Sequence, residues 1–96
     1  MRAVRSYPLP HDVPVDRITI EMPANARVLG VGALPFQSVV WAFGDDAHVP
    51  EARIFVFYGD DQEIAERYPG GLEYVGTLPG ASSAWHLFEV VQQRVR

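Results

Sequence analysis

Arg53 is the clearest candidate for a functional residue, because it is a charged residue within an apolar stretch. The two-residue period of a strand places it on the same face as Phe55 and Phe57. A guanidinium in this position either pairs with a carboxylate, for which Glu73 and Glu89 are candidates, or binds an anionic ligand or partner. Arginine is the residue type used in partly buried ion pairs, so we expect the structural pair.

The histidines are the next candidates, as metal ligands or as bases. His11, His48 and His86 lack the short spacing of helical zinc motifs. A site built from His48, His86 and Asp45 or Asp46 would need distant strands to bring these residues together. We therefore expect no metal site, and we expect His86 to be a hydrogen-bonded, half-buried histidine.

Nucleophiles and paired carboxylates are also present in the sequence. Ser82 and Ser83 lie near His86 but follow Pro-Gly-Ala as ordinary turn residues, without a Gly-x-Ser-x-Gly elbow. The Asp pairs at 45–46 and 60–61 are typical of solvated loops. The chain has no cysteine, so a thiolate nucleophile and a disulfide are excluded. We expect no catalytic residue and no cofactor, and the sequence favours a protein that is not an enzyme.

Charge argues against nucleic acid as a partner. The 96 residues carry a net charge of −4, there is no lysine, and the eight arginines are dispersed, whereas phosphate binding needs clustered cations. No apolar run reaches the roughly 18 residues of a membrane span. The sequence therefore predicts a soluble, cytoplasmic protein without nucleic-acid or membrane partners.

Two stretches that are apolar on both faces predict interior strands. One is Ala52 to Gly59, and the other is Ser38 to Gly44, where Trp41 shares a face with Val39 and Phe43. Strands of this kind are covered on both sides. We expect the two to pair at the centre of one sheet.

The remaining pattern predicts five more strands and one short helix. Alternation in the first strand suggests that Val4 and Tyr7 face inward, and prolines make it an edge strand followed by a loop up to residue 14. Gly30 and Gly32 predict a bulge or bend covered by Trp41 or a phenylalanine. The expected strands are residues 2–9, 16–22, 26–34, 72–78 and 84–91, with a helix at 60–67 and a frayed tail at 92–96.

Turns at roughly ten-residue spacing favour an all-β fold. We expect a single domain over residues 1–96. Its architecture would be a small antiparallel sandwich or a partly open barrel of about seven short strands with one short helical insertion.

Five short motifs also occur, in the same order, in a known family. The chain resembles short proteins of unknown function encoded by phages, prophages and bacteria. It differs from them after Gly59, where the family has a compact Gly-Thr-Gly-His-Pro-Ile turn. The resemblance implies a phage origin and no mechanism. The motifs are Ile20-Glu21-Met22-Pro23 with Ala26 and Leu29, Trp41-Ala42, Arg53-x-Phe55-x-x-Tyr58-Gly59, Tyr74-x-Gly76-Thr77 and His86-x-Phe88-Glu89-Val90.

Two functions from different classes remain. The first is a small non-enzymatic binding module that engages a host protein, its own copies or both, most simply as a homodimer. The alternative is a binder of a small anionic ligand, such as a nucleotide signal, in a pocket lined by aromatic residues and arginine. The candidate ligand- or partner-binding residues are Arg53, Phe55, Phe57, Trp41, Trp85 and His86.

Overall fold

The computed structural model describes residues 1–10, 17–80 and 83–92, and it is all-β, as expected. The described residues form seven strands and no helix. The expected loop up to residue 14, the strand start at residue 16, Ser82 and the expected tail at 92–96 lie at least in part outside these ranges. The strands are β1 (Arg2–Pro8), β2 (Ile18–Pro23), β3 (Arg27–Leu34), β4 (Gln37–Asp45), β5 (Pro50–Gly59), β6 (Leu72–Pro79) and β7 (Ala84–Val90).

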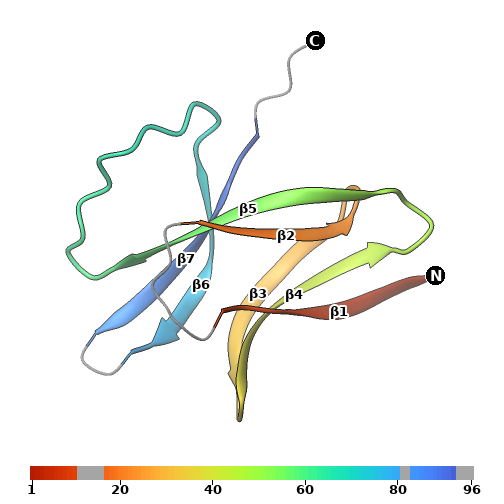
Figure 1. Ribbon diagram of the computed structural model, residues 1–96, viewed down its shortest axis with the longest axis horizontal. Helices are drawn as coiled ribbons and strands as arrows, with labels where there is room; N and C mark the ends of the chain where they lie inside the picture. Colours follow the sequence, from red (N-terminus) through yellow and green to blue (C-terminus); the bar gives the residue numbers. More distant parts are fainter. Residues whose placement is uncertain (11–16, 81–82, 93–96) are drawn as a thin grey trace.

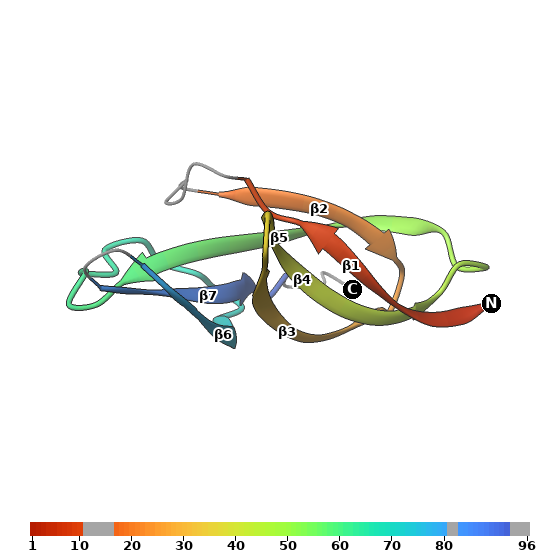
Figure 2. The ribbon, with the colours of Figure 1, turned by 90° about the horizontal axis from the view of Figure 1, so that it is seen from below.

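The strands form two antiparallel sheets. Sheet A has the order β1-β4-β3, and sheet B has the order β2-β5-β7-β6. The sheets lie over one another as a sandwich and do not close into a barrel (Figure 1, Figure 2). As the sequence predicts, β1 is an edge strand; β7 is an interior strand of sheet B.

The prediction that the two apolar strands β4 and β5 pair with each other is wrong. β4 lies between β1 and β3, whereas β5 lies between β2 and β7. Apolar residues on both faces mark a strand as interior, but a sandwich has one interior region in each sheet, and the pattern does not distinguish them. The two strands meet across the core instead, where the side chains of Val40 and Phe55 are fully buried.

The core is one layer of side chains between the sheets. Phe55 is opposite Ile18 on one neighbouring strand and Glu89 on the other, and Phe57 is opposite Leu87. Each fully buried large apolar side chain contributes roughly 1.5–3 kcal/mol. The core residues are Leu9, Ile18, Ile20, Met22, Ala26, Val40, Ala42, Phe55, Phe57, Leu78 and Leu87.

Bulges shape the strands where the two sheets meet. The register of β3 shifts between Val28 and Gly30, which confirms the predicted bulge. The Trp41 ring lies over Gly32, where an added Cβ would be 2.6 Å from its Cζ3, so the predicted cover is also confirmed. A second bulge in β6 precedes Gly76, where an added Cβ would lie 2.6 Å from Val31 Cγ1. The missing side chain lets β3 pack closely on β6.

Residues 60–67, called the acidic loop below, form a turn and an irregular segment, so the predicted helix is wrong. Asp61 has a φ of 60°, in the left-handed region, which is incompatible with continuing a helix from Asp60. Ile64 is 46% exposed. The segment therefore buries no apolar stripe, and without one a helix of this length is marginal in water. Within the described ranges, no helix is long and apolar enough to cross a membrane.

Truncating the same residue type in the core and on the surface tests this architecture. We expect Phe57→Ala to lower the free energy of unfolding by about 3–5 kcal/mol, because it removes a buried ring and leaves a cavity. Phe36→Ala is the matched control, since Phe36 is 90% exposed, and it should cost less than about 0.5 kcal/mol. Urea denaturation measures both values. Equal losses would contradict the packing described above.

Candidate functional site

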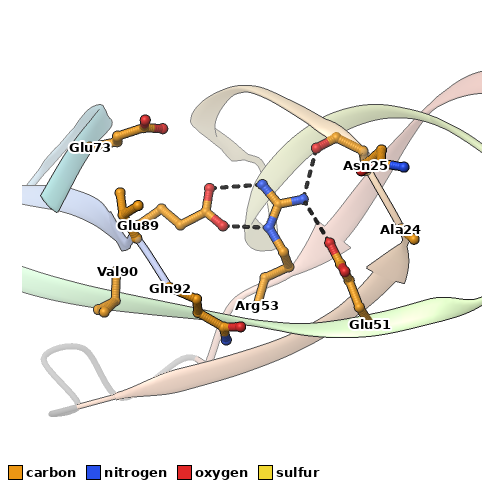
Figure 3. Close-up of a pocket in the computed structure, with 10 residues that line it drawn as sticks. Ala24, Asn25, Glu51, Arg53, Glu73, Glu89, Val90 and Gln92 are labelled. Carbon is orange, nitrogen blue, oxygen red and sulfur yellow. Dashed lines mark hydrogen bonds and ion pairs between the residues drawn. The ribbon is translucent and has the colours of Figure 1, made fainter. Parts of the chain in front are cut away.

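Arg53 lines a cavity of about 550 Å³. Its Nε and Nη2 donate hydrogen bonds to the two carboxylate oxygens of Glu89, and the Nη2 distance is 2.9 Å. Its Nη1 donates to the carbonyl oxygen of Ala26 at 2.7 Å and lies 4.0 Å from Glu51. Figure 3 shows dashed contacts from the guanidinium to Glu89 and Glu51 and none to Glu73. The predicted structural ion pair is therefore confirmed, with Glu89 as the partner.

The charge of this cavity does not suit an anion. Among the residues that the structure describes, Glu51, Glu73 and Glu89 line it, against the guanidinium of Arg53. The hydrogen bonds to Glu89 raise the pKa of Arg53 above its ordinary value. The prediction of an anionic ligand gains no support from this cavity.

The aromatic residues predicted for a binding site do not converge with Arg53. Phe55 and Phe57 are buried between the sheets. Trp85 packs partly buried against the core, beside Gly59, and Trp41 lies half-buried over Gly32. None of these rings lines the Arg53 cavity. Alternation along each strand predicts on which face of its strand each ring lies. It does not show whether rings from different strands share one site.

His86 lies on the outer face of sheet B in a chain of hydrogen bonds. Its Nε2 is 2.6 Å from Asp60 Oδ1, and its Nδ1 is 3.0 Å from the hydroxyl of Thr77. The Thr77 hydroxyl is also hydrogen-bonded to the Tyr74 hydroxyl. The prediction of a hydrogen-bonded, half-buried histidine is confirmed. Asp60, His86 and Thr77 share the residue types of a catalytic triad, but this exposed chain fixes the start of the acidic loop to β6 and β7.

The rest of the outer face of sheet B is partly closed by its own aromatic residues. Phe88 makes edge-to-face contacts with Tyr58 and Tyr74, with ring centroids 6.2 and 5.7 Å apart. The hydroxyls of Tyr58 and Tyr68 are 2.6 Å apart, so the β5–β6 segment is held to this face. Val56, on the same face, is buried.

The outer face of sheet A, called face A below, is apolar and is exposed around Phe43, whereas Val39 at its β3–β4 end is buried. Register places Val4 and Phe43 side by side on it, and both are exposed, at 57% and 39%. The expectation that Val4 faces inward is wrong, because it is opposite Phe43 and not opposite a core residue; Tyr7 does pack against the core. The apolar residues of face A are Val4, Leu29, Leu34, Trp41 and Phe43, with Phe36 in the adjoining turn.

Face A also carries two arginines. The guanidinium carbon of Arg2 lies 5.9 Å from the centre of the Phe43 ring, in a cation–π contact. Arg27 is directly opposite Phe43 on β3 and is exposed. Asp45, at the end of this face, is hydrogen-bonded to the N-terminal ammonium group. Sequence reasoning missed Val4, Leu29, Leu34 and Phe36, although Trp41 and Phe43 on one side of a strand were a signal for an apolar face.

The same change, Glu to Gln, at two different glutamates tests the Arg53 ion pair. Glu89→Gln should lower the free energy of unfolding by about 1.5–3 kcal/mol, because hydrogen bonds to a half-buried guanidinium lose their charged acceptor. Glu73→Gln should change it by less than about 0.5 kcal/mol, since Glu73 is exposed and makes no ion pair within the described residues. Urea denaturation at pH 7 distinguishes the two. A larger loss from Glu73→Gln would mean that Arg53 has another partner.

The Asp60 contact predicts a loss of stability in acid. The hydrogen bonds from His86 and the Ala84 amide hold the pKa of Asp60 below its ordinary value. In acid the unfolded chain therefore binds more protons than the folded chain. The contribution of the Asp60 carboxylate to the free energy of unfolding is complete above the unfolded pKa of about 3.9, and it is lost as the pH falls through the folded pKa. Urea melts from pH 6 downward should show a shallower acid loss for Asp60→Asn than for wild type. Asp61→Asn, the control, should keep the wild-type profile.

Comparison with known proteins identifies a family and no function. No curated protein and no solved structure matches this chain. A family model described as a domain of unknown function (DUF7352) matches residues 1–96. The expected membership of a family without an assigned function is thus confirmed, whereas a phage origin stays a prediction. The match covers the whole length of the chain, which therefore belongs to the DUF7352 family.

Proposed function

We propose that this chain is a small protein-binding module that docks partners on face A. The observation that carries the proposal is the concentration of exposed apolar side chains there. Nine large apolar side chains are exposed in the described residues. Six of them lie in sheet A, in the residue that precedes β1 or in the β3–β4 turn. These six are Met1, Val4, Leu29, Leu34, Phe36 and Phe43.

Exposed apolar residues gathered on one face are typical of an interaction surface. Scattered single apolar side chains are normal on any protein, but a contiguous patch costs solvation free energy unless a partner covers it. Aromatic residues and arginine are the types enriched in protein interfaces. Trp41, Phe43 and Arg2 supply both types within one patch.

The chemistry of face A defines the partner it would bind. Its apolar centre suits an aliphatic or aromatic anchor, and Arg2 and Arg27 suit carboxylates beside that anchor. The partner is therefore a protein surface that combines apolar and acidic side chains. The resemblance to phage and prophage proteins supports a host protein as one such partner, and a second copy of the chain is another.

The competing functions have weaker support. An anionic ligand in the Arg53 cavity would meet three glutamates and a guanidinium that is already hydrogen-bonded. Hydrolytic chemistry at His86 would require the Thr77 hydroxyl, which is also hydrogen-bonded to Tyr74. Protein binding on face A would leave the hydrogen bonds of the Arg53 guanidinium and of the Thr77 hydroxyl unchanged.

Variants that remove the apolar character of face A test the proposal. Leu29→Ser/Phe43→Ser should lose partner proteins that wild type captures, after crosslinking in cells that naturally make the protein and mass spectrometry of the recovered chains. Val49→Ser is the matched control, because Val49 is an apolar residue that is 78% exposed and lies outside face A. Circular dichroism and the urea midpoint establish that each variant is folded. Recovery of the same proteins by all three chains would overturn the proposal.

A further inference from the structure

We infer that a second copy of this chain is a partner of face A, and that it docks through its acidic loop. This inference rests on the proposed role of face A. It adds the identity of the partner and the direction of assembly. Three observations carry it: the composition of the acidic loop, the position of the arginines on face A, and the placement of the two surfaces on the molecule.

The acidic loop has the chemistry that face A requires. Ile64 is an exposed apolar side chain, and Glu63 precedes it directly. Asp61 and Glu63 make no ion pair or side-chain hydrogen bond within residues 1–10, 17–80 and 83–92. Their carboxylates are therefore available to a partner. An apolar anchor with adjacent free carboxylates matches an apolar face with adjacent guanidinium groups.

The acidic loop is also held in place. The side chain of Gln62 accepts a hydrogen bond from the Gly59 amide at 2.9 Å. Glu66 is 3.4 Å from Arg17, and the Tyr68 hydroxyl contacts the Tyr58 hydroxyl. These contacts fix both ends of the loop, so less conformational entropy is lost when it docks.

The spacing of the charges is compatible on the two surfaces. Arg2 and Arg27 lie on the two strands that flank β4, on either side of Phe43. Arg27 is opposite Phe43 and Arg2 is opposite Asp45. Two strand spacings of about 4.8 Å and this two-residue offset place their Cα atoms roughly 12 Å apart. Asp61 and Glu63 are two residues apart, and their side chains can span this distance to the long arginine side chains. Ile64 would then meet the apolar centre of face A.

The placement of the two surfaces makes the contact head-to-tail. β5 runs along the molecule, and the acidic loop at its end lies far from the N-terminus, at the opposite end of the long axis (Figure 1, Figure 2). Arg2 is the first residue of β1 and follows the N-terminal residue directly. A contact between two different surfaces either closes into a ring or continues as an open chain of copies. The predicted two-fold dimer would instead place face A against face A, where the arginines of the two copies face each other and Asp45 is already hydrogen-bonded to the N-terminal ammonium group.

A charge-reversal pair tests the assignment. The face variant is Arg2→Glu/Arg27→Glu. The loop variant is Asp61→Asn/Glu63→Arg, with Asn at residue 61 because it tolerates the left-handed backbone. Sedimentation up to about 1 mM detects the weak association expected of a contact below about 1,200 Å². We expect wild type to associate, and each variant alone to associate at least about tenfold more weakly. An equimolar mixture should recover association, because the loop variant keeps an unaltered face A and the face variant keeps an unaltered acidic loop.

Salt and an apolar control separate this inference from the proposed function. Raising salt from about 50 to about 500 mM should weaken wild-type association, because exposed charge pairs are screened. Association that the loop variant retains but Leu29→Ser/Phe43→Ser loses would overturn the acidic loop as partner and leave face A as a docking surface. A strict wild-type monomer at the highest concentration would overturn self-association, while the capture experiment would still decide the function. Failure of the mixture to recover association would also overturn the inference.

Discussion

The fold depends on burying one apolar layer between a three-stranded and a four-stranded sheet. Phe55 and Phe57 project from β5 into this layer, and Val40 reaches it from β4. A chain of this length has room for one modest core, so this layer must supply most of the hydrophobic stabilisation. The bulges and the side-chain-free position at Gly76 let the sheets approach at β3 and β6. Every other feature, including both candidate surfaces, is positioned by this packing.

The same limit on length explains why one outer face remains apolar. On sheet B, the β5–β6 segment and the rings around Phe88 cover part of the outer face. On sheet A, no comparable segment of the described chain covers Val4, Leu29 and Phe43. The solvation cost of that patch is reduced when a second protein covers it. Face A therefore connects the architecture with the proposed binding function, and the free carboxylates of the acidic loop suggest how the chain itself could satisfy it.

Arg53 shows how a polar group can belong to such a small core without being a binding site. Its methylene stem continues the face of Phe55 and Phe57, and its guanidinium reaches Glu89 and a backbone carbonyl. A half-buried charge is stable only when it is paired and hydrogen-bonded. The pair is thus a requirement of the packing, and the carboxylates around it make the adjoining cavity acidic.

The all-β class, most strand positions and several facing directions follow from the pattern of residues, because alternation of residue types is a local property of each strand. The pattern of residues indicated the bulge near Gly30, the Trp41 ring over Gly32, and Glu89 as one of two possible partners of Arg53. The pattern did not show which strands share a sheet, that Val4 is exposed, or that residues 60–67 form no helix; these features appear only in the folded chain. Folding also places Val4, Leu29 and Phe43 on one face of sheet A. These outcomes depend on contacts between residues far apart in the chain, and a local pattern shows that a side chain is apolar without showing what covers it.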